Sequence, residues 1–406
     1  MSTQRAPGAA VLGFGAALDR EVGWDADVLT ARAARLGLGP ADLAAVRDRP
    51  LRTERDLVAS VLGHLADGSG GEHHVEDPAV LAGFAAGLPG VDSLGGTCVR
   101  AAAAMDLLGL GATVHLAFDT PEVRALLTPG TEVLVADGWD EFHPHVIVQF
   151  PRGAQVRTDL LDVTAPRENR LIYVNDPANE RIRLSPGLGD AVATASVVLV
   201  SGLNAVRDPA LLEDRLTDVT DALSRRRPGS LAFYEDAGYH VPGAARGVRA
   251  RLAPFVDVVS LNDEELAAVA GAVLDLEDPE AVHAAVSDLA RSLGVRTLVV
   301  HSGRWALAHG EVDEVVRDGL RTGVSLATSR YLHGAAATRR TAEKVLGHAV
   351  PDGLGRFAAR LTTLGAGRTV VVPVPPVEPA TPTTIGLGDT FVGGFLAAAL
   401  GSPVRG

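Results

Sequence analysis

Short apolar runs alternate with segments of helical spacing throughout the second half of the chain. Strands are predicted for five of these runs, at 196–200, 231–234, 256–261, 297–300 and 369–374. Helices are predicted between several of them, at 208–225, 263–271, 279–293 and 337–363. Strands that are apolar throughout and alternate with helices are typical of a parallel sheet covered on both faces. This half is therefore predicted to be a parallel sheet with helices on both faces.

The first half of the chain has a different pattern. It begins with an apolar run at 11–14 and a turn at 15–19, and a helical segment with one apolar side follows to about residue 64. A glycine turn at 94–97 leads into an alanine-rich helix. Further strands are predicted at 114–118, 132–135, 146–150 and 171–174. Because their connections are short and carry few helical patterns, we expect a small separate sheet across about 112–184.

The segment 69–74 contains Glu72 next to His73 and His74, a combination that could suggest a metal site. Adjacent side chains point in different directions, however, and no third ligand is apparent nearby. We therefore expect an exposed, flexible loop at this segment.

Polar and glycine residues come directly after the predicted strands of the second half. The groups are Ser201–Asn204, Glu235–Asp236, Asn262 with Glu265, His301–Gly303 and Gly386–Asp389. Each group alone could be ordinary turn chemistry, since these residue types favour turns. In open α/β sheets, ligands bind beyond the carboxyl ends of the strands. Five such ends together predict one site along this rim of the sheet.

The last of these groups, Gly386-Leu387-Gly388-Asp389, opens a helix of small residues. Its glycines permit backbone conformations that a Cβ forbids, and the free N–H groups of a helix start can bind phosphate oxygens. A carboxylate at Asp389 could accept a proton from an attacking hydroxyl group. The alternative is an ordinary helix cap, because aspartate is a favoured capping residue.

Composition narrows the class of protein. With 406 residues, 47% hydrophobic and 21% charged, the chain is predicted to be globular, with two or three domains. Its formal charge of −13 argues against a nucleic-acid polymer as partner. The single cysteine, Cys98, cannot form an internal disulfide and is expected to be a packed core residue in a reducing compartment. No apolar run is long enough to span a membrane and 9–18 is no convincing signal peptide, so we expect a cytoplasmic protein.

An ordered set of short motifs runs along nearly the whole chain. It comprises Phe14–Asp19, Gly71–Glu72, Leu94–Gly96, His145–Phe150, Glu168–Ile172, Ser201–Asn204, Phe233–Glu235, Asn262–Glu265, Thr328–Tyr331 and Gly386–Asp389. This set resembles the ADP-dependent sugar kinase family (ADP-dependent glucokinase and phosphofructokinase) of the ribokinase-like superfamily. The resemblance implies an α/β fold with a doubly wound, mostly parallel sheet, helices on both faces, and a smaller β-rich lid that closes over the sugar. The large domain would comprise mainly 40–65, 97–111 and 185–406, and the discontinuous lid about 11–35, 68–96 and 112–184.

The resemblance also implies the residues of phosphoryl transfer. Asp389 would be the catalytic base, and the backbone of Gly386, Leu387 and Gly388 would form the anion hole. Arg170 matches the lid arginine that meets the transferred phosphate, although by itself it would be read as a surface residue of a strand. Phosphoryl transfer needs positioning and charge neutralisation more than covalent help, and the forked donors of arginine suit a phosphate.

Two further motifs imply a magnesium site. Glu235 matches the glutamate of the family's His-x-Glu motif, and Asn262 with Glu265 matches its Asn-x-x-Glu motif. Mg²⁺ held by carboxylates usually keeps several waters, so these acids would act on it directly or through water. Without the resemblance, Glu265 would be read as a solvated acid near a helix start.

The sugar site implied by the resemblance departs from the family's pattern. Its residues would be Asp19, Glu72, Gly96, Thr97 and His145. The family's Asn-x-Asn is here Gly15-Ala16-Ala17, Thr97 replaces an asparagine, Gln149 a glutamate and Phe233 the histidine of His-x-Glu. Each lost polar partner would cost roughly 1–3 kcal/mol with glucose. We therefore expect neither glucose nor fructose 6-phosphate, but a larger or less hydroxylated acceptor such as a nucleoside or modified sugar.

The sequence therefore predicts a Mg²⁺-dependent kinase that phosphorylates a hydroxyl of a sugar-like small molecule. ADP as donor, rather than ATP, rests on the resemblance alone. One alternative is a catalytically inactive homologue that binds sugar or nucleotide, which the altered sugar site motivates. The other is an ATP-dependent ribokinase-like kinase, which fits the Gly386–Asp389 turn but not the long, complex lid.

Overall fold

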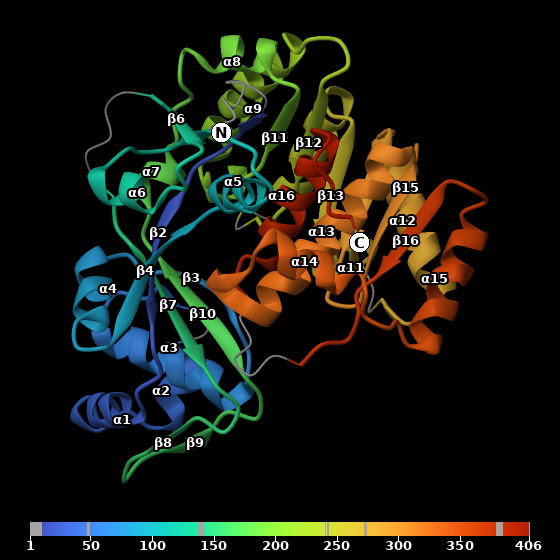
Figure 1. Cartoon of the computed structure of the whole chain (residues 1–406). Coiled ribbons are helices and arrows are strands. Elements are labelled where there is room, and N and C mark those ends of the chain that lie inside the picture. Colours follow the sequence, from blue (N-terminus) through green and yellow to red (C-terminus); the bar gives the residue numbers. More distant parts are fainter. Residues whose placement is uncertain are drawn as a thin grey trace. The chain divides into compact units, whose positions relative to one another are not determined.

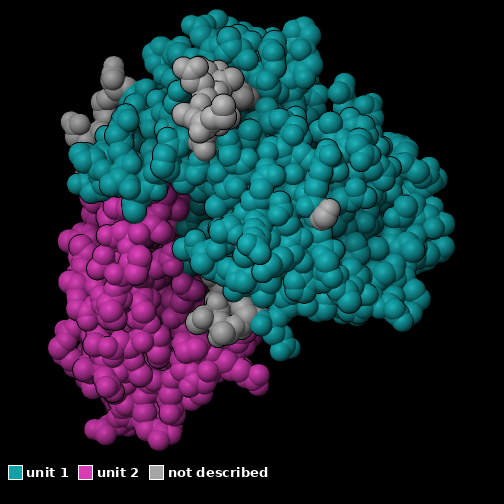
Figure 2. Space-filling model, in the orientation of Figure 1, with its two compact units in different colours: residues 1–16, 96–138, 179–406 teal, residues 17–95, 139–178 magenta. Residues whose placement is uncertain are grey.

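The computed structural model describes residues 10–46, 49–136, 142–239, 241, 243–271, 274–378 and 385–405. The chain divides into two compact units, coloured separately in Figure 2. Unit 1 comprises Met1–Ala16, Gly96–Gly138 and Asn179–Gly406, and unit 2 comprises Ala17–Gly95 and Trp139–Ala178. Each unit has its own sheet and its own hydrophobic core, and each is described by itself.

The described residues of unit 1 form a nine-stranded sheet in the order β16-β15-β14-β13-β12-β11-β1-β5-β6 (Figure 1). Its strands are β1 (Ala10–Leu12), β5 (Ala112–Leu116), β6 (Thr131–Val135), β11 (Val197–Val200), β12 (Leu231–Glu235), β13 (Val258–Asn262), β14 (Thr297–His301), β15 (Trp305–Gly310) and β16 (Thr369–Pro373). Neighbouring strands from β6 to β14 pair in parallel, and β15 and β16 add an antiparallel edge. The predicted doubly wound, mostly parallel sheet is confirmed.

Helices pack on both faces of this sheet. They are α5 (Thr97–Leu107), α6 (Pro121–Leu126), α8 (Leu188–Thr194), α9 (Pro209–Ser224), α10 (Ala244–Leu252), α11 (Asp263–Ala270), α12 (Pro279–Leu293), α13 (Glu314–His333), α14 (Arg339–Val345), α15 (Asp352–Leu364) and α16 (Leu387–Ala399), with α7 (Pro177–Glu180) at the unit boundary. On β12, the ring of Phe233 packs against Phe395 of α16, with centroids 5.1 Å apart. Tyr234, the next residue, points to the opposite face, because side chains alternate along a strand.

Several helices begin where the sequence supplies a cap. Asp208 and Asp278 precede α9 and α12, and each side chain accepts hydrogen bonds from two backbone N–H groups of the first turn. Each is followed by proline, which suits the first helical position. Helix α12 ends at Gly294, which takes the left-handed conformation that favours glycine. The capping residues in the sequence therefore determine where α9 and α12 begin and where α12 ends.

Glycines bring α16 unusually close to its neighbours. A Cβ at Gly394 would lie 2.8 Å from the Cα of Gly323 on α13, and a Cβ at Gly393 would lie 2.5 Å from the carbonyl oxygen of Ala101 on α5. Both distances are below ordinary van der Waals contact, so only glycine fits at either position. Helix α16 is thereby held firmly between α5 and α13.

The described residues of unit 2 form a five-stranded sheet in the order β3-β10-β7-β2-β4, together with a two-stranded ribbon of β8 and β9. The strands are β2 (Ala17–Val22), β3 (Gly71–His74), β4 (Gly90–Gly95), β7 (His145–Phe150), β8 (Gln155–Arg157), β9 (Asp162–Thr164) and β10 (Asn169–Val174). The helices are α1 (Ala26–Arg35), α2 (Pro40–Ala45), α3 (Glu54–Asp67) and α4 (Pro78–Ala85). One face of the sheet, with Val148, Leu171 and Tyr173, packs into a core shared with α3.

The units differ from the domains expected from the sequence, most of all in two segments, and residues 11–16 and 179–184, expected in the lid, also lie in unit 1. Residues 40–65, expected in the large domain, lie in unit 2, because α3 buries Leu57, Val58 and Val61 in the core of the smaller sheet. Residues 112–136, expected in the lid, lie in unit 1, because β5 and β6 pair in parallel with each other and with β1. The segment expected to be a separate sheet thus contributes to both units.

The segment 69–74 is also different from the expected loop. Residues Gly71–His74 form strand β3, which pairs in parallel with β10. The side chain of His73 is half-buried against Tyr173, with ring centroids 5.5 Å apart, and burial lowers its pKa to about 4. Because β3 is polar, it can be recognised as a strand only from its pairing with β10.

A membrane-spanning helix is not found in the described part of the chain, where every helix is too short or too polar to cross a bilayer. Cys98 is fully buried, as predicted, and its thiol donates to the carbonyl oxygen of Gly15 at 2.7 Å. Burial raises the pKa of this thiol to about 12, so Cys98 is a core residue rather than a nucleophile.

Candidate functional site

The predicted glycine turn opens helix α16. Gly386 is the N-cap of α16 with φ 70°, a left-handed conformation that favours glycine. The backbone N–H and the hydroxyl of Thr390 both donate to the carbonyl oxygen of Gly386, at 3.0 and 2.7 Å. Asp389 lies in the first turn of the helix, with 23% of its side chain exposed. Its carboxylate is therefore accessible beside the free N–H groups of the helix start.

Two arginines flank this turn. Neither was predicted as a site residue, although Arg330 belongs to the motif Thr328–Tyr331. Arg100 of α5 has its Nη1 4.0 Å from Oδ2 of Asp389. Arg330 of α13 donates from Nε to the carbonyl oxygen of Ile385 at 3.1 Å. The available signal for Arg100 was a cation set among small apolar residues directly after the Gly95-Gly96 turn.

Glu235 and His301 connect two other strand ends to the same turn. Glu235 ends β12, His301 ends β14, and Nε2 of His301 lies 2.8 Å from Oε1 of Glu235. The imidazole also lies against α16, with its ring 4.9 Å from that of Phe391, and a Cβ at Gly388 would lie 3.1 Å from its Cε1. Although burial alone would lower the pKa of His301, Glu235 raises it above its ordinary value.

Asn262 and Glu265 form a capping box at the start of α11. The side chain of Asn262 accepts from the backbone N–H of Glu265 at 2.8 Å, and the Glu265 carboxylate accepts from the backbone N–H of Asn262 at 2.8 Å. Burial first, and then the nearby Glu235, raise the pKa of Glu265 to about 7. Glu265 is therefore a helix-start acid and also a neighbour of Glu235.

The acids of this rim fit a magnesium ion. Among the described residues, Oε2 of Glu235 is buried without a hydrogen-bond partner, although a carboxylate oxygen buried in this way needs one. Two neighbouring carboxylates repel each other, and a divalent cation would offset the repulsion. No group of three or more His, Cys, Asp or Glu in metal-binding geometry occurs in the part of the chain that is described. Mg²⁺ is commonly held by one or two carboxylates together with waters and substrate phosphates, which suits this pair.

A buried ion pair fixes the loop that follows Glu235. Asp236 pairs with Arg249 of α10, and the hydroxyl of Tyr234 donates to Oδ1 of Asp236 at 2.7 Å. Burial raises the pKa of Tyr234 well above its ordinary value, so the phenol stays a donor. The network holds the end of β12 in place from the face opposite α16.

In unit 2, His145 lies between two carboxylates. Its Nδ1 is 3.5 Å from Oδ1 of Asp19 and its Nε2 is 3.0 Å from Oδ2 of Asp176. Burial by itself would lower the pKa of His145, but the hydrogen bonds to Asp176 and Asp19 raise it to about 10. A Cβ at Gly95 would lie 2.3 Å from Oδ2 of Asp19, so the carboxylate occupies space that only glycine leaves open.

The other predicted residues of unit 2 share one face of its sheet. Residues opposite one another on neighbouring strands point to the same side, and side chains alternate along each strand. Asp19 lies opposite His145, Arg170 opposite Gln149, and Glu72 opposite Ile172, two residues from Arg170. Asp19, Glu72, His145 and Arg170 therefore point away from the hydrophobic core, on one polar face. Sequence reasoning missed Asp176, which comes two residues after the end of β10.

Gly96 and Thr97 belong to unit 1, at the start of α5. Gly96 has φ 98°, and a Cβ there would lie 3.2 Å from the Cα of Ala16. Thr97 is the first residue of α5. Gly96 therefore allows the backbone at the start of α5 to lie close to the backbone of Ala16.

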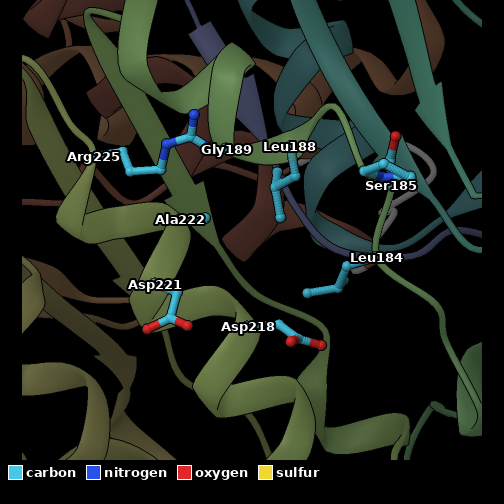
Figure 3. A pocket seen from close by; sticks show the side chains of 9 residues that line it. Leu184, Ser185, Leu188, Gly189, Asp218, Asp221, Ala222 and Arg225 are labelled. Carbon is cyan, nitrogen blue, oxygen red and sulfur yellow. The ribbon is translucent and has the colours of Figure 1, made fainter.

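A hollow of about 290 Å³ on unit 1 lies outside this group. It is lined by residues of α8, α9 and the segment before α8, including Asp218, Asp221 and Arg225 (Figure 3). The carboxylates and the guanidinium that Figure 3 labels belong to exposed side chains of α9 and its C-terminal end. None of the residues predicted from the sequence lines it.

The protonated state of His145 predicts how the stability of unit 2 depends on pH. Below the unfolded pKa of 6.5 both states carry the proton, and the stabilisation is fully present. As the pH rises to about 10, the unfolded chain loses the proton and the folded chain must also give it up, so the stabilisation is lost. We expect the free energy of unfolding to fall across this interval, and His145→Gln to remove this component. Denaturant titrations of both proteins would measure it, and identical pH slopes would contradict the ion pairing.

Comparison with known proteins identifies the family. Residues 11–304 match the family model described as the ADP-specific phosphofructokinase/glucokinase conserved region. This match covers most of the chain and includes the ends of β12, β13 and β14, from which Glu235, Asn262 and His301 come. Asp389 lies beyond the matched region.

Solved structures show the same fold. A phosphofructokinase from Pyrococcus horikoshii OT3, solved with AMP, is 17% identical with a TM-score of 0.77, over 97% of this chain and 98% of that one. The last common ancestor of ADP-dependent phosphofructokinases from Methanosarcinales is 16% identical with a TM-score of 0.72, over 98% of this chain and 94% of that one. An ADP-dependent kinase in complex with fructose-6-phosphate and ADPβS is 14% identical with a TM-score of 0.71, over 98% and 95%. The chain is a kinase that belongs to the ADP-specific phosphofructokinase/glucokinase family.

Proposed function

We propose that the protein transfers the β-phosphoryl group of ADP to a hydroxyl group of a sugar or sugar-like acceptor, with Mg²⁺ as cofactor and Asp389 as general base. The observation that carries the proposal is the place of Asp389 in the first turn of α16, on a glycine turn that also lies against His301, the partner of Glu235. Membership of the family supports nucleotide-to-sugar phosphoryl transfer independently.

In this reaction the acceptor oxygen attacks the β-phosphorus while its proton passes to the carboxylate of Asp389. The bond from the β-phosphorus to the bridging oxygen breaks, and AMP leaves with the electron pair. The N–H groups at the start of α16 stabilise the negative charge on the oxygens of the transferred group. An accessible carboxylate beside these N–H groups suits a transfer that depends on positioning and charge neutralisation.

Glu235 and Glu265 would hold the Mg²⁺ ion, directly or through its waters, with Asn262 fixing the start of α11. When bound, the ion neutralises charge on the phosphate oxygens. His301 holds Oε1 of Glu235 and leaves Oε2 for other partners. The residues of this rim thus supply the oxygen ligands that Mg²⁺ prefers.

We propose that the polar face of the unit 2 sheet binds the acceptor. Asp19 and His145 would bind hydroxyl groups, and Glu72 and Arg170 lie on the same face of the sheet. Ala16 and Ala17 have no polar side chain to offer, which favours an acceptor with fewer hydroxyls than glucose, such as a nucleoside or modified sugar. One relative was solved with fructose-6-phosphate, so that compound belongs in any test.

A direct assay tests the proposal. The purified protein is incubated with Mg²⁺, ADP or ATP, and a panel of sugars, sugar phosphates and nucleosides, and AMP formation and phosphorylated product are measured. We expect transfer from ADP with at least one acceptor. A folded protein that consumes neither nucleotide with any acceptor would refute it, and turnover with ATP alone would indicate the ATP-dependent alternative.

A second candidate is an inactive homologue that binds nucleotide. It is favoured by Phe233, which stands in place of a family histidine and is packed against Phe395 in the core, so that it offers no polar group. This candidate predicts nucleotide binding in calorimetry without turnover in the same panel.

Glu235→Gln is expected to raise the Mg²⁺ concentration for half-maximal activity by about 10-fold or more, because an amide oxygen lacks the charge of a carboxylate. A titration of activity with Mg²⁺ at saturating ADP measures it. The matched control is Asp221→Asn, which removes an exposed carboxylate of α9 at the hollow in Figure 3. Superimposable metal titrations for Glu235→Gln and the wild type would remove Glu235 from the metal site.

A further inference from the structure

The side chain of Arg100 lies across the glycine turn at the start of α16. A Cβ at Gly386 would lie 2.7 Å from Nη1 of Arg100 and 2.8 Å from its Cδ. The guanidinium therefore lies directly over the left-handed residue that opens the helix. Only 11% of this side chain is exposed, so most of its length is buried in the protein.

The guanidinium of Arg100 also lies near Asp389. Nη1 lies 4.0 Å from Oδ2 of Asp389, whereas a charge-assisted hydrogen bond between such groups is about 2.7–2.9 Å long. A guanidinium carries five N–H donors in a planar fork. Its chemistry suits an oxyanion with several oxygens, such as a phosphoryl group.

The positive charge of Arg100 would offset a repulsion between two negative groups at this turn. A phosphoryl group at the N-terminus of α16 would come close to the carboxylate of Asp389, and the two negative charges would repel each other. The partial positive charge of a helix start, about half an elementary charge, does not neutralise both. A full positive charge from Arg100, within reach of the same turn, offsets the repulsion.

The position of Arg100 is set by the packing of its helix. The next residue, Ala101, has its carbonyl oxygen 2.5 Å from the place where a Cβ of Gly393 would be, so α5 and α16 are in direct backbone contact. Both Arg100 and the turn are therefore carried on helices that cannot shift independently. A cation that is held in this way before the substrate arrives needs little reorganisation.

We propose that Arg100 is a catalytic residue that binds the phosphoryl group being transferred, at the Gly386–Asp389 turn. The inference rests on the proposed function, since the group in question is the β-phosphoryl of ADP. It differs from the role implied for Arg170, because Arg100 belongs to unit 1 and to the helix packed on α16. Positive charge at the turn would then come from unit 1 itself.

The experiment compares ADP with AMP, which lacks the β-phosphoryl group. Binding of each nucleotide to the wild type, Arg100→Met and Arg100→Lys is measured by calorimetry with Mg²⁺ present and no acceptor. We expect Arg100→Met to weaken ADP binding by about 10-fold to 100-fold and AMP binding by less than about twofold, because a hydrogen bond to a charged group is lost only with ADP. Arg100→Lys keeps the positive charge but lacks the forked donors. Its affinity for ADP should therefore lie between those of the wild type and Arg100→Met.

Arg225→Met is the matched control, because Arg225 is exposed on α9 and pairs with Asp190. It should change neither affinity. In the assay with acceptor, Arg100→Ala should regain part of its kcat when guanidinium ion is added at low, non-denaturing concentration, and Asp389→Asn should not.

Equal weakening of ADP and AMP binding by Arg100→Met, or no weakening of either, would overturn the inference and leave Arg100 as a residue that supports the turn. If the wild type transfers phosphate from ADP while the variant behaves in this way, the proposed function still stands. A wild type that binds no ADP overturns both. Thermal melts of the Arg100 variants identify misfolding, and Arg100→Lys then carries the comparison.

Discussion

Asp389→Asn is expected to lower kcat by about 100-fold to 10,000-fold, with the affinity for ADP changed by less than a few-fold. The asparagine has nearly the same shape and leaves the N–H groups of the α16 start in place, so the phosphate site persists. What it cannot do is accept the proton of the acceptor hydroxyl. Steady-state kinetics with the acceptor found in the panel, together with calorimetry of ADP, would separate the two effects.

The control for this prediction tests the alternative that Asp389 is only a helix-start acid. Asp352 occupies the first turn of α15 and is exposed, so Asp352→Asn removes the same kind of favourable charge at a helix start. That loss costs roughly 0.3–1 kcal/mol of stability and should leave kcat unchanged. If Asp389→Asn behaves like Asp352→Asn, with a small loss of stability and full activity, Asp389 is no base. A comparable loss of turnover and nucleotide affinity would indicate instead that it organises the turn.

Gly394→Ala is expected to destabilise the protein by about 1–3 kcal/mol. The added Cβ would lie 2.8 Å from the Cα of Gly323 and 2.9 Å from the carbonyl oxygen of Thr322. Both are backbone atoms of α13, so no side chain can rotate away and the helices must separate. Chemical denaturation, followed by a probe of unit 1, would measure the change. Since α16 carries Asp389, we also expect a loss of kcat in the folded variant.

Gly355→Ala is the matched control, because it makes the same change inside a helix where a Cβ would meet nothing within 4 Å. Without a clash, alanine stabilises a helix by about 0.5–1 kcal/mol relative to glycine. The two variants should therefore have effects of opposite sign. Stabilisation by Gly394→Ala would show that α13 and α16 are not in close contact.

The parallel sheet of unit 1 was predictable because its central strands consist mostly of apolar residues. Runs such as Val197–Val200 and Thr297–His301 are buried on both faces and need no partner to be recognised. Polar strands escaped prediction. Residues Gly71–His74 and Ala17–Val22 form β3 and β2, although they were expected to be a loop and part of a turn. Their backbone hydrogen bonds go to neighbouring strands, which no local pattern encodes.

The sequence also failed to predict which sheet some of the strands belong to. The apolar runs that become β5 and β6 are like those that become β7 and β10, and all four were expected in one small sheet. The first two join the large sheet and the last two the small one. An apolar strand gains nearly the same burial in either sheet, so the choice depends on long-range pairing rather than on its own residues.

For the candidate site, too, some residues could be predicted from the sequence and others could not. The polar residues at the strand ends, among them Asp389, Glu235 and Glu265, could be located from the sequence, whereas the roles expected for them rest on the family resemblance. The arginine and histidine side chains that lie around these acids could not be predicted from the sequence. Arg100 stands nearly 290 residues before Asp389, and His301 contacts Glu235 from a strand two positions away in the sheet.

By itself, the sequence determined the fold class, because apolar periodicity is a local property of the chain, and it determined the family through an ordered set of short motifs. Only the tertiary structure decided which strands belong to which unit, that His145 lies between Asp19 and Asp176, and that Arg100 lies over the glycine turn. These facts depend on pairings and helix contacts between distant segments, whose free energy is set by the partner and not by the residue alone.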